Sequence, residues 1–259
     1  MAEPVEVARA GVLAGLPHGF LGRRGGVSGG VIAGLNVGLG AGDDGAAVAE
    51  NRVRAVAAVL PGGRLATVYQ VHSPNCVIAA EPWDDAERPH ADALVTDRPG
   101  LVLGVVTADC APVLLADREA GVVGAAHAGW KGALGGVTDA TIAAMEALGA
   151  RRSAIAAAIG PCISQASYEV DAGFRDRFIG EHTESAAFFA DGAPDHFQFD
   201  LEGYVAARLG QAGIGSVERL GLDTYADASR FYSFRRATHC GELSYGRQIS
   251  LISLPKAMP

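Results

Sequence analysis

The chain has 259 residues, 49% hydrophobic and 19% charged, which is enough apolar material for a sizeable core and excludes a disordered chain. The net charge is −8, and basic residues never cluster beyond Arg-Arg pairs, so there is no basic face for a nucleic acid. The N-terminus carries Glu3 and Glu6 before any apolar run, and the longest apolar region, 101–116, contains Asp109 and is too short for a membrane span. We therefore expect a soluble, cytoplasmic protein without nucleic-acid or membrane partners.

Hydrophobic patterning predicts strands and helices in alternation. The glycine-rich stretch 22–42 indicates short strands joined by tight turns, and residues 47–60 form a helical pattern that stops at Pro61. Further strands are expected at 65–71, 76–80, 101–106, 113–116, 122–126, 154–159, 217–220 and 249–254. Further helices are expected at 138–148, 174–178 and 203–211. With no internal repeat and no boundary signal, residues 1–259 are predicted to form one α/β domain.

Three segments place metal-capable side chains at the ends of apolar strands: Gln70-Val71-His72, Ala108-Asp109-Cys110 and His127-Ala128-Gly129-Trp130. Two imidazoles and one thiolate suit a catalytic zinc ion, which keeps its fourth position open, and could also accept copper. The gaps of 38 and 17 residues are too long for a finger motif, so the fold must bring the segments together. Each residue also has a structural interpretation: Cys110 as a buried small hydrophobe, and His72 as a cap on a backbone carbonyl.

The other histidines and cysteines carry less signal. His18, His90, His182, His196 and His239 lie in polar contexts and are interpreted as surface residues. No CxxC spacing occurs among the four cysteines; Cys76 is expected in a strand core and Cys162 in a turn segment, whereas the sequence does not decide whether the Cys240 thiol is exposed.

Short motifs spread over nearly the whole chain show a family resemblance. They are RRGGVS (23–28), LN (35–36), GDD (42–44), NR (51–52), QVH (70–72), ADA (91–93) with Thr96, TADC (107–110) with Pro112, HAGWKG (127–132), GPCI (160–163), YEV (168–170), YSFRR (232–236) and GR (246–247). In this order they resemble the YfiH-type family, long labelled multicopper polyphenol oxidoreductase or laccase-domain proteins.

The resemblance implies a fold, a metal site and an activity. The fold is a layered α/β/β/α arrangement with mixed sheets, and the metal, usually taken as zinc, is bound by His72, Cys110 and His127. The implied activity is phosphorolysis of adenosine, inosine and methylthioadenosine, with adenosine deamination, so a purine nucleoside and phosphate are the expected partners. Some members are associated with hydrolytic editing of peptidoglycan precursors.

This chain departs from the family pattern at two places. Asp223-Thr224 stands where many members have Cys-Thr, and residues 237–245 form an insertion that contains His239 and Cys240. Both are expected near a substrate wall, so they bear on substrate choice more than on the metal.

Phosphorolysis needs cations for phosphate, and Arg23, Arg235, Arg236 and Arg247 are the candidates, whereas Arg24 is interpreted as a surface residue. Asn36 and Gln70 are further candidate substrate-binding residues, although Gln70 would serve equally as a loop hydrogen-bonder. Asp109 is a candidate proton shuttle beside the catalytic Cys110 and His127, or else a structural carboxylate. Trp130 could stack on a base, but core packing is the stronger expectation.

Two other enzyme classes stay open. A copper polyphenol oxidase (laccase) needs several coppers and many histidines, but this chain has seven histidines and no HxH pair. A metal-free cysteine amide hydrolase would use Cys110 as nucleophile and His127 as base, with His72 as an orienting group.

Overall fold

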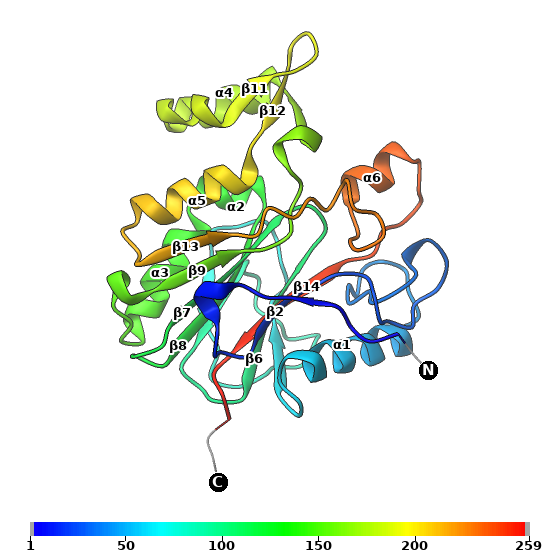
Figure 1. Cartoon of the computed structure of the whole chain (residues 1–259), viewed down its shortest axis with the longest axis vertical. Helices are drawn as coiled ribbons and strands as arrows, with labels where there is room; N and C mark the ends of the chain where they lie inside the picture. The colour runs from blue at the N-terminus through cyan, green and yellow to red at the C-terminus, as the bar shows by residue number, and fades with distance from the viewer. Residues whose placement is uncertain (1–2, 257–259) are drawn as a thin grey trace.

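The computed structural model describes residues 3–256, which form two mixed β-sheets packed face to face with helices on both outer sides (Figure 1). This is the α/β/β/α arrangement implied by the family resemblance. No helix within this range is long and apolar enough to cross a membrane.

The first sheet has five strands in the order β1-β2-β14-β6-β3. β14 pairs antiparallel with both β2 and β6, whereas β3 runs parallel to β6. The strands span Val7–Ala8 (β1), His18–Leu21 (β2), Arg64–Thr67 (β3), Leu101–Thr107 (β6) and Gln248–Ser253 (β14).

The second sheet has six strands in the order β13-β9-β7-β8-β5-β4. Its centre is antiparallel, and its two edge strands pair in parallel with their neighbours. The strands span Cys76–Ile78 (β4), Ala93–Thr96 (β5), Ala111–Asp117 (β7), Val122–Ala128 (β8), Ala156–Ile159 (β9) and Ser216–Arg219 (β13).

Buried aliphatic side chains fill the space between the sheets. Leu103 and Val105 of β6 meet Leu114 of β7 and Val123 of β8 in one apolar cluster, all fully shielded from solvent. Because both faces of β6, β7 and β8 are covered, these strands are almost continuously apolar.

Helices cover the outer faces of the sheets. α1 (Gly45–Val59) packs on the five-stranded sheet, while α3 (Val137–Ala147) and α5 (Leu201–Gln211) pack on the six-stranded sheet. α1 and α5 each begin at an aspartate, Asp44 and Asp200, whose carboxylate accepts a hydrogen bond from a first-turn amide. Two shorter helices border the site described below: α2 (Trp130–Gly135) and α6 (Phe234–His239).

A small third sheet extends the molecule beyond α5 (Figure 1). It consists of β10 (Glu169–Asp171), β11 (Phe189–Asp191) and β12 (His196–Phe199), together with α4 (Ala172–Glu181). An aromatic cluster that includes Phe174, Phe178 and Phe199 joins this unit to Tyr204 of α5 and Trp130 of α2. Single-turn 3-10 helices occur at Gly11–Leu13, Gly30–Ile32, Arg152–Ala154 and Gln165–Ser167, and a longer one at Thr183–Phe188.

Most predicted elements are present within a few residues, but two predictions were wrong. Residues 22–42 form no strand; they contain one 3-10 turn and one isolated bridge, because side chains such as Asn51 supply the hydrogen bonds that a strand ladder would provide. The strand expected at 65–71 ends at Thr67. Beyond it, the Gln70 side-chain amide takes up both backbone groups of Val106, at 2.7 Å each, in place of ladder bonds.

Candidate metal centre and adjoining cavities

His72, Cys110 and His127 converge at one point between the two sheets. Their candidate ligand atoms all lie within 4.8 Å of one another, and Cys110 Sγ is 3.9 Å from His72 Nε2. His127 is buried, Cys110 half-buried and His72 exposed, so the group has a closed inner side and an open outer side. Among residues 3–256 this is the group of three or more His, Cys, Asp or Glu side chains with metal-binding geometry.

The strand register explains how two of the three residues meet. β7 and β8 pair antiparallel so that Ala111 faces Ala128. This register brings Cys110, which directly precedes β7, beside His127, the second-last residue of β8. His72 comes instead from the loop after β3, where its φ of +59° is unusual for a residue with a side chain. Asp109 also has a positive φ, of +84°, at the turn that leads into Cys110. Such conformations persist only where the surroundings hold them, and both lie at this site.

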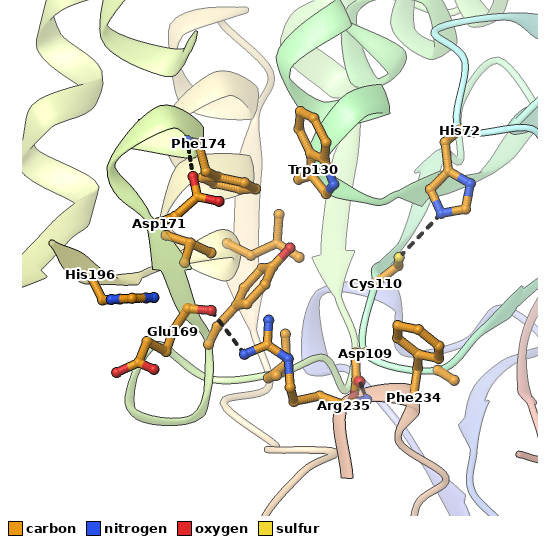
Figure 2. Close-up of a pocket in the computed structure, with 15 residues that line it drawn as sticks. His72, Asp109, Cys110, Trp130, Glu169, Asp171, Phe174, His196, Phe234 and Arg235 are labelled. Carbon is orange, nitrogen blue, oxygen red and sulfur yellow. Dashed lines mark hydrogen bonds between the residues drawn. The ribbon is translucent and has the colours of Figure 1, made fainter. Parts of the chain in front are cut away.

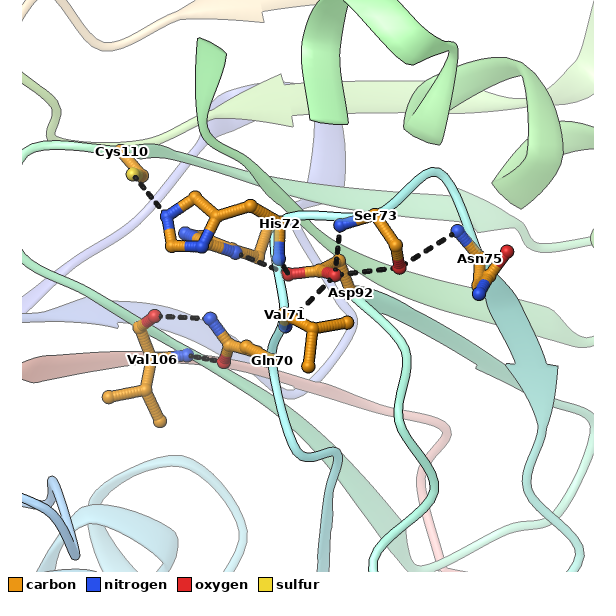
Figure 3. Close-up of polar contacts among 9 residues, drawn as sticks. Gln70, Val71, His72, Ser73, Asn75, Asp92, Val106 and Cys110 are labelled. Atoms are coloured by element: carbon orange, nitrogen blue, oxygen red, sulfur yellow. Dashed lines mark hydrogen bonds and ion pairs between the residues drawn. The ribbon is translucent and has the colours of Figure 1, made fainter. Parts of the chain in front are cut away.

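Asp92 holds two of these residues in place (Figure 3). Its fully buried carboxylate accepts hydrogen bonds from the backbone amides of Val71, His72 and Ser73, from the Ser73 hydroxyl, and from His127 Nδ1 at 2.8 Å. Because Nδ1–H donates to Asp92, the opposite ring nitrogen, Nε2, is the one free to bind a metal. The sequence interpretation did not assign Asp92 a role, although it lies within one of the family motifs.

The geometry is compatible with a bound metal ion such as zinc. Tetrahedral zinc with ligands at about 2.0–2.3 Å places its ligand atoms roughly 3.3–3.8 Å apart, close to the 3.9 Å between His72 Nε2 and Cys110 Sγ. Gly129 leaves the space open: a Cβ there would lie 2.8 Å from His72 Cδ2 and 2.9 Å from Cys110 Sγ. These donors are also compatible with copper, so they do not identify the metal.

The protein favours an ion pair at this position. Burial by itself would raise the pKa of Cys110, but the charge and hydrogen bond of His127, together with His72, lower it to about 6. Burial would lower the pKa of His127, but the Cys110 thiolate and Asp92 raise it to about 9. Burial opposes ionisation of Asp92 too, yet its hydrogen bonds from His127 and Ser73 hold its pKa at about 2. Cys110 and His127 thus each stabilise the charged form of the other, a thiolate beside an imidazolium.

Two cavities open onto this group from different sides. One, the aromatic cavity of about 560 Å³, is walled by rings and by two acidic residues of the third sheet, Glu169 and Asp171 (Figure 2). Its ring-bearing and charged lining residues are His72, Trp130, Tyr168, Phe174, His196, Phe234, Asp109, Glu169, Asp171 and Arg235. Figure 2 shows the Arg235 guanidinium between Glu169, whose backbone carbonyl it donates to, and Asp109.

The other, the arginine cavity of about 590 Å³, lies toward α1 and the glycine-rich loop. Its ring-bearing and charged lining residues are Tyr69, Phe234, Tyr245, His72, His127, Arg52, Arg88 and Arg247. His72, Ala108, Cys110 and Phe234 line both cavities, so the candidate metal centre lies where they meet.

Asp109 lies in the aromatic cavity with its carboxylate already engaged. It accepts from the Thr224 hydroxyl and from the Arg235 amide, at 2.7 Å each. Burial raises its pKa in spite of these bonds. Both predicted interpretations, a proton carrier and a structural carboxylate, are compatible with this position.

The predicted substrate-binding residues separate into two groups. Arg235 lines the aromatic cavity, while Gln70 and Arg247 line the arginine cavity. Arg23 and Arg236 line neither; both guanidinium groups donate to backbone carbonyls, as in the bonds of Arg236 to Thr224, Tyr225 and Phe231.

Asn36 is fully buried and lines neither cavity, but its amide oxygen accepts from the backbone of Gly38 and of Arg247. For Arg23, Arg236 and Asn36 these contacts favour a role in holding the backbone over direct substrate binding.

Other sequence interpretations meet mixed outcomes. His18 was wrongly expected at the surface: it is 2% exposed and bonds backbone groups of Ala10 and Leu16. His196 is exposed as expected, but it lines the aromatic cavity. Trp130 packs on Phe174 with ring centroids 5.0 Å apart and lines the same cavity, so packing and base stacking are compatible.

Cys76 lies in a strand, as predicted, and the structure shows how far each of the other cysteines is buried. Cys76 is partly buried in β4, and burial raises its pKa to about 12. Cys162 is buried and Cys240 exposed.

The two departures from the family pattern lie behind the cavity walls or at their edge. Asp223 accepts from the hydroxyls of Ser164 and Ser167, and Thr224 donates to Asp109. The inserted segment contributes Tyr245 to the arginine cavity.

Residues 17–255 match the family model described as multi-copper polyphenol oxidoreductase laccase. The chain belongs to this family. Among curated relatives, a purine nucleoside phosphorylase of Deinococcus radiodurans is 42% identical over 249 residues, covering 93% of this chain and 90% of its own. One from Pseudomonas aeruginosa is 36% identical over 223 residues, covering 86% and 88%.

Solved structures of related proteins have the same fold. The Neisseria meningitidis protein NMB0706 superposes with a TM-score of 0.87 at 35% identity, covering 97% of this chain and 99% of that one. YlmD from Geobacillus stearothermophilus gives a TM-score of 0.87 at 28% identity, covering 99% and 98%.

Proposed function

We propose that this chain is a zinc-dependent purine nucleoside phosphorylase that acts on adenosine, inosine and methylthioadenosine and also deaminates adenosine. One observation carries the proposal: a His-Cys-His group lies where two cavities meet. Two substrates that must react with each other can therefore reach the same point from different sides. The names of the relatives supply the substrate class.

His72, Cys110 and His127 would hold the zinc ion. Zinc bound there would supply a Lewis acid that polarises a substrate oxygen or activates water. Asp92 fixes the His127 tautomer and the His72 backbone, so the donors are oriented before the metal arrives.

The aromatic cavity suits the nucleoside. Trp130, Tyr168 and Phe234 offer ring faces for a purine, and the carboxylates and Arg235 offer partners for its exocyclic groups and ribose hydroxyls. In phosphorolysis the C1′–N9 bond breaks as a phosphate oxygen bonds to C1′, and the purine takes the electron pair and a proton. Asp109 is our candidate carrier of that proton, because burial raises its pKa and it lines this cavity.

Product analysis tests the proposal directly. Purified enzyme with measured zinc and copper content is incubated with adenosine, inosine or methylthioadenosine, with and without phosphate. We expect ribose 1-phosphate or its methylthio analogue only when phosphate is present, and inosine from adenosine without it. Cys110→Ala should lose both metal and turnover, whereas Cys240→Ala, which changes an exposed thiol, should keep both. Equal base release without phosphate, or turnover surviving in Cys110→Ala, would contradict the assignment.

A second candidate, a cysteine amide hydrolase that edits peptidoglycan precursors, is favoured by one contact. His127 lies between the Cys110 thiol and the Asp92 carboxylate, which is the order of nucleophile, base and orienting acid in such enzymes. Removal of zinc by a chelator separates the two candidates. A hydrolase activity would survive it, and the phosphorylase activity would not.

A further inference from the structure

The two cavities that meet at Cys110 have opposite electrostatic character. The aromatic cavity is lined by three acidic residues, Asp109, Glu169 and Asp171, and by one arginine, Arg235. A phosphate dianion placed there would face like charges in a partly desolvated space, which is unfavourable.

The arginine cavity has the reverse lining. Arg52, Arg88 and Arg247 line it, and no Asp or Glu does. The nearest carboxylate partner, Asp85, pairs with Arg52 at 3.0 Å and with Arg88 at 3.4 Å from outside the lining, and its side chain is 56% exposed. One carboxylate thus offsets part of two arginine charges, and the cavity keeps a net positive charge.

Of the three arginines that line this cavity, Arg247 is the one without a carboxylate partner among the described residues. Within residues 3–256 no Asp or Glu lies within ion-pair distance of its guanidinium. Its side-chain hydrogen bond goes to the Tyr245 hydroxyl at 2.9 Å, and its guanidinium lies 4.7 Å from the centre of that ring.

Contacts with Asn36 and Gly38 fix the position of Arg247. The Asn36 amide oxygen accepts from the amides of Arg247 and Gly38, which ties the strand start to the glycine-rich loop. Gly38 lets the side chain lie flat against that loop, since a Cβ there would be 3.1 Å from both Cδ and Nη1 of Arg247. A charged, oriented guanidinium without an anionic partner, at the wall of a cavity, is prepared for an external anion.

We propose that the arginine cavity binds the phosphate co-substrate, with Arg247 as the principal phosphate ligand and Arg52 and Arg88 as supporting cations. This inference rests on the proposed phosphorylase function. It places phosphate and nucleoside in separate cavities that share Cys110, His72 and Phe234, so each reaches the reacting centre from its own side. Of the arginines expected from the sequence to bind phosphate, only Arg247 keeps that assignment, and Arg235 moves to the nucleoside side.

Steady-state kinetics with both substrates varied provide the test, on the zinc-loaded enzyme. Because Arg247→Gln removes a charge-assisted, two-pronged contact with phosphate, it should raise the KM for phosphate roughly 10- to 100-fold. The KM for adenosine should stay within about twofold. Arg247→Lys keeps the positive charge but cannot make the two-pronged contact, so its KM for phosphate should lie between those of wild type and Arg247→Gln. Arg235→Gln should do the opposite, raising the KM for adenosine and leaving that for phosphate.

Two further variants keep the test interpretable. Arg24→Gln removes an arginine that contacts Glu6 and Ser229 away from both cavities, and it should change neither KM. Arg88→Gln should raise the KM for phosphate by a smaller factor than Arg247→Gln, and it serves if Arg247→Gln does not fold.

Inorganic phosphate alone is also titrated into wild type and Arg247→Gln by calorimetry, without nucleoside. Binding lost in the variant supports the proposal, and equal binding overturns it. An unchanged KM for phosphate in both Arg247→Gln and Arg88→Gln also overturns it, even when wild type makes ribose 1-phosphate. A wild type that forms no sugar phosphate overturns the proposed function instead, and the calorimetric titration then decides by itself whether this cavity binds the anion.

Discussion

Replacing Asp92 by Asn tests whether Asp92 orients the candidate metal ligands His72 and His127, with which it forms hydrogen bonds. The change keeps the size and shape of the side chain but replaces one acceptor oxygen by an NH₂ donor. In wild type, one oxygen accepts from His72 N and His127 Nδ1, and the other from Val71 N and from the amide and hydroxyl of Ser73. Either orientation of the new amide therefore places its NH₂ against donors and removes at least two hydrogen bonds.

The size of the effect follows from these contacts. A hydrogen bond to a charged group contributes about 1.5–3 kcal/mol, so the variant should lose at least about 3 kcal/mol of unfolding free energy. For a chain of this length that corresponds to a Tm at least about 6 °C lower. Zinc affinity should fall roughly 10- to 100-fold, the usual effect of removing the partner that orients a ligating histidine. When the NH₂ group faces His127, it favours the tautomer whose Nε2 carries the proton and cannot bind metal.

The assays are thermal unfolding of the metal-free protein and competition for zinc against a chelator of known affinity. Asp117→Asn is the matched control: Asp117 is equally buried and accepts from three backbone amides, but it ends β7 at the far side from Cys110. This control should lose stability and keep its zinc affinity. Zinc affinity within twofold of wild type in Asp92→Asn, or an equal loss in both variants, would refute the reasoning.

The pH dependence of stability gives an independent check on Asp92. The pKa of Asp92 is about 2 in the folded protein and about 3.9 in an unfolded chain, so the folded state favours its ionised form. Its contribution is fully present above about pH 4 and is lost as the pH falls toward 2. The stability difference between wild type and Asp92→Asn should therefore shrink over that range in acid-unfolding curves, and a difference that stays constant would show that ionisation plays no part.

Three further outcomes are expected. Gly129→Ala should abolish zinc binding while the protein still folds, because its Cβ would lie 2.9 Å from Cys110 Sγ. Gly135→Ala, whose Cβ would lie 3.7 Å from its nearest neighbouring atom, should keep the metal, and elemental analysis measures the zinc content of both variants. Zinc binding at pH 7.5 should release about one proton, because the pKa of His127 is about 9 and the Cys110 thiol, with a pKa of about 6, is already ionised. Calorimetry in buffers of different ionisation enthalpy measures the number of protons released, and no release would contradict the ion pair. In the metal-free protein, alkylation of Cys110 by iodoacetamide should reach half its maximal rate near pH 6, as followed by mass spectrometry of a Cys240→Ser variant; a midpoint near pH 9 would mean that His127 does not stabilise the thiolate.

The sequence by itself determined the class of the fold and which residues could bind a metal. Apolar runs set the central strands, since β6, β7 and β8 are covered on both faces and need little else. The family motifs then identified His72, Cys110 and His127, which the structure brings together. The assignment of one domain to the whole chain stays a prediction, as do the metal's identity and the catalytic roles.

Only the tertiary structure decided which polar residues face a cavity. Arg23, Arg236, Arg235 and Arg247 look alike in the sequence. The guanidinium groups of Arg23 and Arg236 donate to backbone carbonyls and line neither cavity, whereas Arg235 and Arg247 line the two different cavities that meet at the candidate metal centre. Asp92 shows the same limit, because its five donors come from a loop about 20 residues earlier and from His127, 35 residues later. Local sequence records a side chain's chemistry, whereas its partners depend on which distant segments the packed sheets place beside it.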